Sequence, residues 1–444
     1  MSSVHTVSRG VVFTLAALMT VLSSGGLVLG FGPVYMRLAD ELQWHALCPA
    51  NSTAVCPSQE VQLQNVFTTG FLGLVLGQTV FGICLDVVGP RYTTVLSAIV
   101  AIAGNVCMAT GDARQGTGGL ITAGYGLIAF GGMGVLFASL QLAELFAAPS
   151  VYCGLLVAAF YASGYVYVLL GTSISRATFF YGSAIVTGVC ALGGYALFPI
   201  RHVSTEAARV AVPGLAFERP LTDVAKFKYL WAEYKLQLRR RDFWVFVCVG
   251  SFLTLINVFA GGAVPNIVKQ LEPRDVSLQS TYTNYLYPLV SNSSFVFAPF
   301  TGWIIERRGF RKAAVVTVVE FGMLCGSMML PSLRAQILSF ALLAIAVGSL
   351  TAIQYSYIMK CFPSKLYGLL SGTVTIVVFV FCLLNYALTP LAQNTFDGNN
   401  NYVFLILLVP TVGTLGLIRY LRDEPDADDK RTALLEPGAD LADP

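Results

Sequence analysis

The chain has 444 residues, of which 55% are hydrophobic and only 11% are charged, with a formal net charge of +3 and a mean hydropathy of +0.69. Soluble globular proteins carry about 25% charged residues. The composition therefore excludes a soluble globular protein and indicates a chain that lies mostly within a membrane.

Long apolar segments follow one another along the whole chain. A helix needs about 20 mostly apolar residues to cross the hydrocarbon layer. Twelve segments meet this need: 11–33, 61–83, 92–110, 119–142, 151–172, 177–199, 243–267, 282–304, 313–331, 335–358, 366–390 and 401–420. The sequence predicts an all-α membrane protein with twelve transmembrane helices. The first segment is too long for a signal peptide and lacks a clear cleavage site, so we expect it to be a span.

The connection between the first two spans contains two cysteines and a glycosylation sequon. Cys48 and Cys56 have seven residues between them, and the sequon begins at Asn51. On the non-cytosolic side of a membrane such cysteines can form a disulfide, and the asparagine can be glycosylated. We predict both modifications for this loop. A second sequon, at Asn292, lies inside a span and is discounted.

A short charged turn occurs twice, at positions that differ by half the chain. Its members are Gly82, Asp86, Gly89 and Arg91 in GICLDVVGPR, and Gly302, Glu306, Gly309 and Arg311 in GWIIERRGFR. Each copy lies between two predicted spans. Such a repeat indicates two pseudo-symmetric six-helix halves around a central site, which is typical of secondary transporters. We expect the acids of these turns to latch the halves together on the cytosolic side, as a gate.

The longest connection divides the spans into six and six. It predicts an N-terminal half (1–199), a cytosolic linker (200–242), a C-terminal half (243–420) and a cytosolic tail (421–444). Lys and Arg concentrate in the linker, the tail and the loops on their side, so both termini are expected in the cytosol. This topology already explains the basic residues, which therefore indicate no nucleic-acid site. The linker is interpreted as a tether with a surface helix; the alternative is a lipid-contacting helix with Trp231 and Tyr234 at the interface.

The spans expected to line the pathway are the first and fourth of each half, and their cores contain no ionisable side chain. A strongly charged cargo would require an opposite charge there, in spite of its cost in the membrane. A zwitterion could instead bind freed backbone N–H and C=O groups, and a sugar could bind the same groups. The predicted substrate-binding residues are Ser23, Ser24 and Gly25 for a carboxylate, with Gly132, Ser139, Tyr161, Asn257, Asn292 and Gln354. Close helix packing is the alternative explanation of the glycines.

One acid, Glu320, lies within a span. Because the ninth span should belong to the outer scaffold, we favour a structural role over a proton relay. The cysteines outside the first loop are interpreted as packing residues. No Cys/His spacing predicts a metal site, and no cofactor is expected. No Ser-His-Asp set or phosphate-binding loop suggests an enzyme.

Four stretches resemble one family. Residues 65–91 (NVFTTGFLGLVLGQTVFGICLDVVGPR), 129–146 (AFGGMGVLFASLQLAELF), 158–164 (AAFYASG) and 359–372 (MKCFPSKLYGLLSG) are similar to the L-type large-neutral-amino-acid facilitators of the major facilitator superfamily. The resemblance implies the major facilitator fold and sodium-independent facilitated movement of leucine, isoleucine, methionine or phenylalanine. Related protist transporters share these signatures, and some prefer cationic or tyrosine-like amino acids. This chain has Val87-Val88 where the family has a basic residue, which implies a weaker cytosolic latch.

The sequence thus predicts an alternating-access uniporter for neutral amino acids with large apolar side chains. Its partners would be that small-molecule substrate and the lipid bilayer, with the monomer as the working unit. The alternatives are a proton-coupled symporter or exporter of a sugar, monocarboxylate or cationic amino acid, and a receptor that retains the fold without transport. We expect the plasma membrane; Leu434-Leu435 after several acids in the tail leaves an endolysosomal or vacuolar membrane as the alternative.

Overall fold

The computed structural model describes residues 9–49, 55–142, 149–198, 224–362 and 366–423, and within them the chain forms helices and connecting turns without a β-strand. This is the outcome expected in hydrocarbon, where every backbone N–H and C=O must find its partner within the chain. Asn51 and Leu434-Leu435 lie outside the described residues. The predicted all-α membrane fold is confirmed.

The first six spans are built from α1 (Arg9–Ser23), η1 (Gly25–Gly30), α2 (Phe31–Asp40), α3 (Pro57–Thr110), α4 (Gly118–Gln141), α5 (Pro149–Ala162), η5 (Ser163–Gly171) and α6 (Arg176–Leu197), with short turns η2 (His45–Leu47) and η3 (Ala113–Gln115) between them. Helix α3 contains both the second and third spans. Its continuity is interrupted at Gly89, whose φ of 81° and ψ of 171° lie outside the helical region. The first and fifth spans continue as 3₁₀ turns rather than straight helices.

The last six spans follow the linker helix α8 (Val224–Leu238). They are built from α9 (Arg241–Leu271), α10 (Val276–Ser280), η6 (Thr281–Leu286), α11 (Tyr287–Ser291), α12 (Ser294–Arg308), α13 (Phe310–Met328), α14 (Gln336–Cys361), α15 (Tyr367–Cys382), α16 (Asn385–Pro390), η8 (Leu391–Thr395) and α17 (Asn400–Ile418). The described helices therefore occupy all twelve predicted segments. The eighth and eleventh spans are each divided into shorter pieces.

Nine of the described segments are long and apolar enough to cross a membrane, and Leu155–Gly171 is a shorter apolar segment. The two remaining spans depart from this pattern for visible reasons. The eighth span is broken between α11 and α12 at Asn292 and Ser293. The ninth, α13, includes Arg311, Lys312 and Glu320 within 19 residues.

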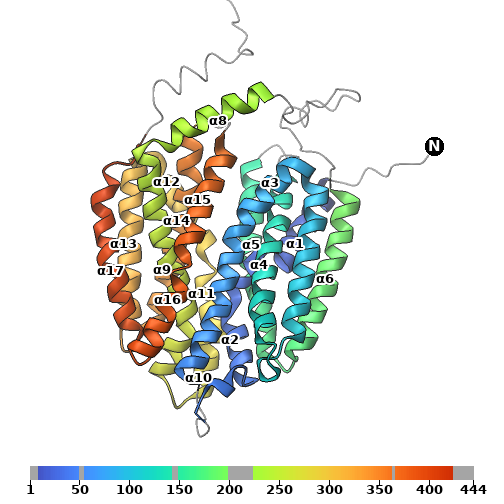
Figure 1. Cartoon of the computed structure of the whole chain (residues 1–444), viewed down its shortest axis with the longest axis vertical. Helices are drawn as coiled ribbons and strands as arrows, with labels where there is room; N and C mark the ends of the chain where they lie inside the picture. The colour runs from blue at the N-terminus through green and yellow to red at the C-terminus, as the bar shows by residue number, and fades with distance from the viewer. Residues whose placement is uncertain (1–8, 50–54, 143–148, 199–223, 363–365, 424–444) are drawn as a thin grey trace, which may run out of the picture.

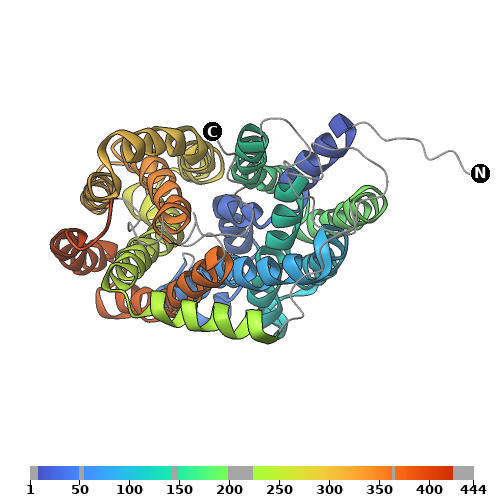
Figure 2. The ribbon, with the colours of Figure 1, turned by 90° about the horizontal axis from the view of Figure 1, so that it is seen from above.

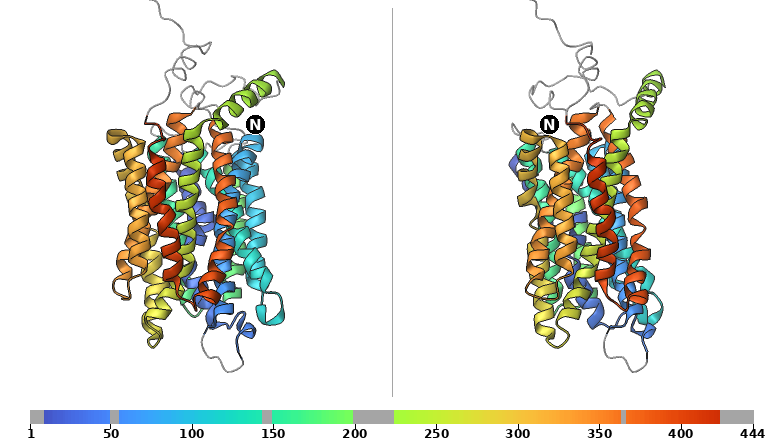
Figure 3. Two further views of the ribbon diagram at one scale, coloured as in Figure 1. Left: turned by 60° about the vertical axis from the view of Figure 1, so that its left-hand side comes forward. Right: turned by 90° about the vertical axis from the view of Figure 1, so that its left-hand side faces the viewer.

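The helices form two bundles that stand side by side (Figures 1 and 2). Helices α1 to α6 make one bundle and α9 to α17 the other, and α8 lies across one end. We call the end with α8 the linker face and the opposite end, where the chain passes from α2 to α3, the loop face (Figure 3). Tyr234 of α8 pairs its hydroxyl with that of Thr373 on α15 at 2.6 Å, so the linker helix packs on the second bundle.

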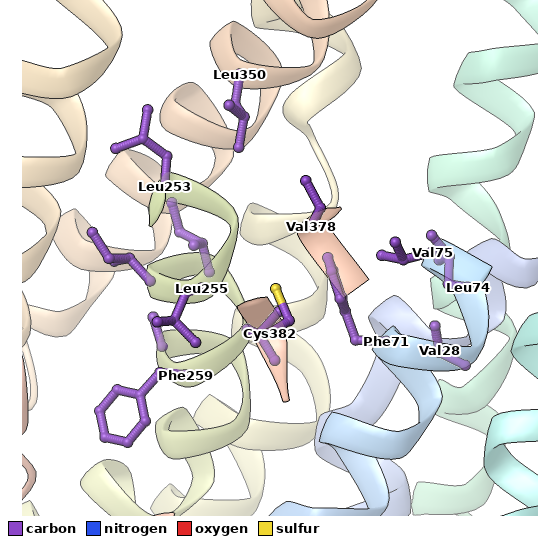
Figure 4. Packing of buried hydrophobic residues seen from close by; sticks show 14 of the residues in the cluster. Val28, Phe71, Leu74, Val75, Leu253, Leu255, Phe259, Leu350, Val378 and Cys382 are labelled. Atoms are coloured by element: carbon purple, nitrogen blue, oxygen red, sulfur yellow. The ribbon is translucent and has the colours of Figure 1, made fainter. Parts of the chain in front are cut away.

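Apolar side chains cover both the interior and the outer surface. On the outside, Ile185 and Leu192 of α6 and Val409 of α17 are exposed by 69%, 72% and 69%. Exposed apolar surface of this kind is expected where lipid replaces water. Inside, one buried apolar cluster runs across both bundles, and Figure 4 draws members of it from α3 (Phe71, Leu74), α9 (Leu253, Phe259) and α15 (Val378, Cys382). Helices α3 and α15 thus supply much of the contact between the halves.

The two copies of the repeated turn have the same backbone. Gly89 has φ 81° and ψ 171°, and Gly309 has φ 83° and ψ 169°. A positive φ of this size is readily adopted only by glycine, so the repeated glycine has a structural reason. The agreement supports the predicted pseudo-symmetry of the two halves. The half boundary at residue 199 adjoins residues outside the description and stays a prediction.

Candidate functional site

A cavity lies between the two bundles. The first bundle lines it with Leu29, Phe67, Phe71 and Tyr161, and the second with Asn257, Gly261, Tyr287, Ser291, Asn292, Ser294, Leu343 and Val347. The described residues that line it include no charged side chain. Its wall is therefore apolar and aromatic, with amide, hydroxyl and backbone groups.

A proline opens the backbone of α9 at this cavity. In an α-helix the carbonyl of residue i accepts from the N–H of residue i+4, and Pro265 has no N–H. The carbonyl of Gly261 is therefore without its helical donor, and it accepts instead from the Tyr287 hydroxyl at 3.3 Å. The second half thus offers a backbone carbonyl oxygen at the cavity as an acceptor.

The break in the eighth span lies at the same cavity. Helix α11 ends at Ser291 and α12 begins at Ser294, and no side chain caps the start of α12. Between them Asn292 is only 3% exposed, and its Nδ2 has no acceptor among the described residues. A buried amide donor without a partner is costly to keep. Its position in the cavity wall indicates a group that can bind a ligand.

Two further polar side chains complete the wall. Tyr161 lies on α5 and Thr351 on α14. Their hydroxyl groups are 3.2 Å apart, and this contact joins the two halves. Asn257 lies one helical turn before Gly261 on α9, and it also lines the cavity. Residues four apart share one helix face, so Asn257 and the freed carbonyl of Gly261 present acceptors side by side.

The structure brings together three of the predicted substrate-binding residues, namely Tyr161, Asn257 and Asn292. The signal that sequence reasoning missed was Pro265, which follows Gly261 by four residues. It also missed the aromatic wall of Phe67 and Phe71, because apolar side chains within a span do not distinguish a cavity from a core.

The other predicted residues of the first and fourth spans lie in helix contacts. The Ser24 hydroxyl donates to Oγ of Ser163 at 3.4 Å. A Cβ on Gly132 would lie 2.2 Å from the backbone nitrogen of Gly25, and one on Gly25 would lie 2.7 Å from the carbonyl oxygen of Ala129. These glycines therefore let the first and fourth spans pack closely in this conformation. A role for Ser24, Gly25 or Gly132 in binding a carboxylate stays a prediction.

The remaining candidates are also away from the central cavity. Ser23 and Ser139 are buried, with 2% and 0% exposure, and Ser23 lies beside Cys190. Gln354 lines a second cavity, which lies within the second bundle and is bounded mostly by apolar side chains such as Phe246 and Leu350. The two cavities share no lining residue, and of these two it is the central one that both halves line.

Contacts between the halves close the loop face. A Cβ on Gly32 of α2 would lie 2.0 Å from the carbonyl oxygen of Thr283 in η6, so only glycine permits this approach. Asn385 of α16 donates to the Thr68 hydroxyl at 2.6 Å, and the next residues, Thr69 and Tyr386, pair their hydroxyls at 2.6 Å. The cavity is thus separated from the loop face by direct contacts of the two bundles.

A buried carboxyl group lies among these contacts, and sequence reasoning did not identify it. Glu60 of α3 is 1% exposed, accepts from the Tyr35 hydroxyl at 2.5 Å and accepts from Nε2 of Gln64 at 2.8 Å. From the other half, Asn266 and Lys269 of α9 lie near this carboxylate, and the positive charge of Lys269 attracts it. The cluster therefore spans the boundary between the halves near the loop face.

The arginines of the repeated turn bind within their own halves. Arg91 donates from Nε to the carbonyl of Phe198, just after α6, at 2.8 Å. Arg311 donates to the carbonyl of Leu421, just after α17, at 2.5 Å, and lies 3.7 Å from Asp423. Each turn thus ties its own sixth span to the bundle, the same role in both halves.

The other members of the turn give no bond between the halves in the described part of the chain. A Cβ on Gly302 would meet nothing within 4 Å, one on Gly82 would meet the Phe137 ring at 3.9 Å, and Glu306 is exposed. The side chain of Asp86 lies outside the described residues. A cytosolic latch formed by these residues stays a prediction.

Two other predictions can be placed. The sulfur atoms of Cys48 and Cys56 are 1.97 Å apart, so the two cysteines lie where a disulfide would form. Glu320 of α13 neighbours Ser349 of α14, whose hydroxyl pairs with that of Thr301 on α12 at 2.8 Å. Glu320 lies in the scaffold of the second bundle and lines neither cavity. Its function stays open to test.

Comparisons with known proteins agree with this geometry. The family model of the Major Facilitator Superfamily matches residues 11–385. A crystal structure of the nucleoside transporter NupG is similar at a TM-score of 0.65 and 11% identity, over 94% of this chain and 100% of that one. An inward-open structure of the xylose transporter XylE from E. coli is similar at a TM-score of 0.60 and 14% identity, over 93% of this chain and 97% of that one. A peptide transporter of the POT family is similar at 0.57 and 14% identity, over 97% and 98%. No curated protein matches the chain.

Proposed function

Because the chain belongs to the Major Facilitator Superfamily, and is therefore a multi-pass membrane carrier of small solutes rather than an enzyme, we propose that its cargo is a neutral amino acid with a large apolar side chain. Movement is by alternating access, without coupling to sodium. The two bundles rock about the central cavity, so that it opens first toward one face and then toward the other.

The uncharged lining of the central cavity carries this proposal. A cationic or anionic cargo would leave its net charge without an opposite charge in a medium where that is costly. A zwitterion has no net charge, and its two ends need only local donors and acceptors. Phe67, Phe71 and Leu343 supply an apolar wall for its side chain.

The solved transporters of similar fold are named for a nucleoside, xylose and a peptide, and a sugar is the strongest rival here. A sugar requires several polar partners at once. In this cavity the hydroxyls of Ser291 and Ser294 already donate to backbone carbonyls at 2.7 and 2.8 Å, and Tyr161 is paired with Thr351. The amide oxygen of Asn257 and the unpartnered Nδ2 of Asn292 suit one ammonium and one carboxylate better than a ring of hydroxyls.

Proton coupling remains the second candidate because of Glu60. This carboxyl group is buried at the boundary between the halves, where alternating access would change its surroundings. A carboxyl group that exchanges a proton on each cycle would belong in such a place. Our proposal of a uniporter requires instead that Glu60 keeps one protonation state throughout the cycle.

Uptake of radiolabelled leucine decides between these functions. Cells that express the chain are compared with cells that do not, with and without an imposed proton gradient, and with excess unlabelled neutral amino acids, xylose or lysine as competitors. We expect uptake that neutral amino acids inhibit and that the gradient leaves unchanged. Gradient-driven accumulation would establish proton coupling. Competition by xylose or lysine alone would refute the proposed cargo.

The same cells test the proposed location and topology. We place the protein in the plasma membrane with both termini in the cytosol, the Cys48–Cys56 disulfide formed and Asn51 glycosylated. Epitope tags at the two ends should be reached by antibody only after permeabilisation. A mobility shift on glycosidase treatment that is absent from an Asn51→Gln variant would verify glycosylation of Asn51. Antibody staining of the terminal tags in intact cells would show that the termini lie outside the cytosol and would refute the proposed topology.

A further inference from the structure

We propose that the second half alone binds the backbone of the amino acid, with its carboxylate on Asn292 and the start of α12 and its ammonium on Asn257 and the carbonyl of Gly261. The first half then contacts mainly the side chain. This inference rests on the proposed function, since it describes how that cargo is held. It assigns opposite roles to two asparagines that line one cavity.

The carboxylate end is assigned by unused donors. Nδ2 of Asn292 is buried in the cavity wall without an acceptor among the described residues. Around it, α11 ends at Ser291 and α12 begins at Ser294, and no side chain hydrogen-bonds the start of α12. Helix α12 has 15 residues, and its uncapped N-terminus carries partial positive charge. Unused donors at a helix N-terminus are a site for an anionic group.

The ammonium end is assigned by acceptors on one face of α9. Pro265 removes the helical donor of the Gly261 carbonyl, which keeps a lone pair beyond its 3.3 Å contact with Tyr287. Asn257 is one turn earlier on the same face and supplies an amide oxygen. An ammonium group has three donors and no acceptor, which matches a carbonyl beside an amide oxygen. No charged side chain among the described residues lines the cavity to compete for either end.

The apolar side chain then lies against the first half. Phe67 and Phe71 of α3 and Leu29 of η1 form that wall. A Cβ on Gly261 would come within 2.8 Å of the Phe67 ring, so the ring lies directly over the backbone of α9. Closure of the first half over the side chain would therefore depend on the size of that side chain. Selection among neutral amino acids is thus a property of α3, and recognition of the amino-acid backbone a property of α9 and α12.

The test makes the same substitution at both asparagines. Asn292→Asp places a negative charge beside the cargo carboxylate, and Asn257→Asp places one beside the ammonium. Leucine uptake is measured with two unlabelled competitors: leucinamide, which lacks the carboxylate, and 4-methylpentanoate, which lacks the ammonium. Asn292→Ala serves as a second variant that removes the donor without adding charge. Surface expression and monodispersity in detergent show that each variant folds.

For Asn292→Asp we expect the apparent KM for leucine to rise about tenfold or more, the effect of losing a hydrogen bond to a charged group, with inhibition by leucinamide retained. Asn292→Ala should raise the KM for leucine similarly. Asn257→Asp should lower the KM for leucine, because a carboxylate accepts from an ammonium group more strongly than an amide oxygen does, and it should weaken inhibition by 4-methylpentanoate.

The proposal is overturned if Asn292→Asp keeps the wild-type KM for leucine, or if the KM for leucine rises equally in the two Asp variants. It is also overturned if Asn257→Asp raises the KM for leucine and Asn292→Asp does not. Failure of the proposed function is distinct, because it would appear in the wild-type protein as absence of competable leucine uptake. A wild-type protein that takes up leucine, with variants that do not discriminate the analogues, would refute only the orientation.

Discussion

At the scale of single residues, the central cavity depends on groups that the helices leave without partners. An unpaired carbonyl or amide in a membrane is costly, so each one needs a local cause. For Gly261 the cause is Pro265, and for Asn292 it is the break between α11 and α12. The chemistry of the site thus comes from interrupted helices and not from ionised side chains.

Replacement of Pro265 by alanine tests this view. The new N–H would bond the Gly261 carbonyl and remove it as an acceptor for the cargo, while the helix itself would gain stability, since proline is about 3 kcal/mol less favourable than alanine inside a helix. We expect a KM for leucine that is several-fold higher, with equal or higher thermal stability. Pro410→Ala in α17 is the control, because Pro410 is also inside a helix but not at the cavity. An unchanged KM in Pro265→Ala would show that the free carbonyl has no part in binding.

At the scale of helices, the contacts that join the halves near the loop face are polar and specific. Tyr35, Glu60 and Gln64 of the first half meet Asn266 of α9, which also accepts from Nδ2 of Asn400 in α17 at 2.9 Å. A polar cluster of this kind holds when both halves are in place and loses partners when they separate. Such a contact can therefore report whether the loop face is closed.

Substitution of Glu60 should separate its roles. Glu60→Ala leaves the buried Tyr35 hydroxyl and Gln64 amide without their acceptor, which costs about 1–3 kcal/mol; Glu60→Gln keeps one carbonyl acceptor and should cost less. We expect the apparent melting temperature of the purified protein in detergent to fall in the order wild type, Gln, Ala. Equal melting of all three proteins would contradict a stabilising role. If Glu60→Gln also abolished a proton-gradient effect on uptake, the proton-coupled alternative would be favoured.

At the scale of the whole molecule, transport requires the two bundles to move while each stays intact. The hydroxyls of Thr79 on α3 and Thr375 on α15 are hydrogen-bonded across the boundary between the halves. Those of Thr301 and Ser349 are 2.8 Å apart but lie within the second half, on α12 and α14. Both pairs consist of two hydroxyl groups. The expected motion would separate the first pair and leave the second pair together.

Disulfide cross-linking of cysteines placed at these two pairs tests whether the halves move at the first contact. Oxidation of a Thr79→Cys/Thr375→Cys protein should cross-link the halves and stop leucine uptake, and a reducing agent should restore it. Oxidation of a Thr301→Cys/Ser349→Cys protein should form its cross-link with little effect on uptake. If the first cross-link forms to completion and leucine uptake continues, the proposal that the two halves move apart at this contact is wrong.

The sequence by itself determined the class of the molecule: twelve apolar segments, a repeated glycine turn and a pathway without ionised side chains. These are local or periodic properties, which hydropathy and residue identity express directly. They also predicted Tyr161, Asn257 and Asn292, because polar residues in a membrane span need a reason.

Only the tertiary structure decided which polar groups meet. Gly25 and Gly132 could serve either close packing or a ligand, and the neighbouring backbone places them in a helix contact. Gln354 lies in a different space from Asn257, and Glu60, near a helix start, is buried by a partner from the other half. The physical reason is that the rotation of each helix and the contact between the halves depend on side chains far apart in the chain, which no local pattern contains.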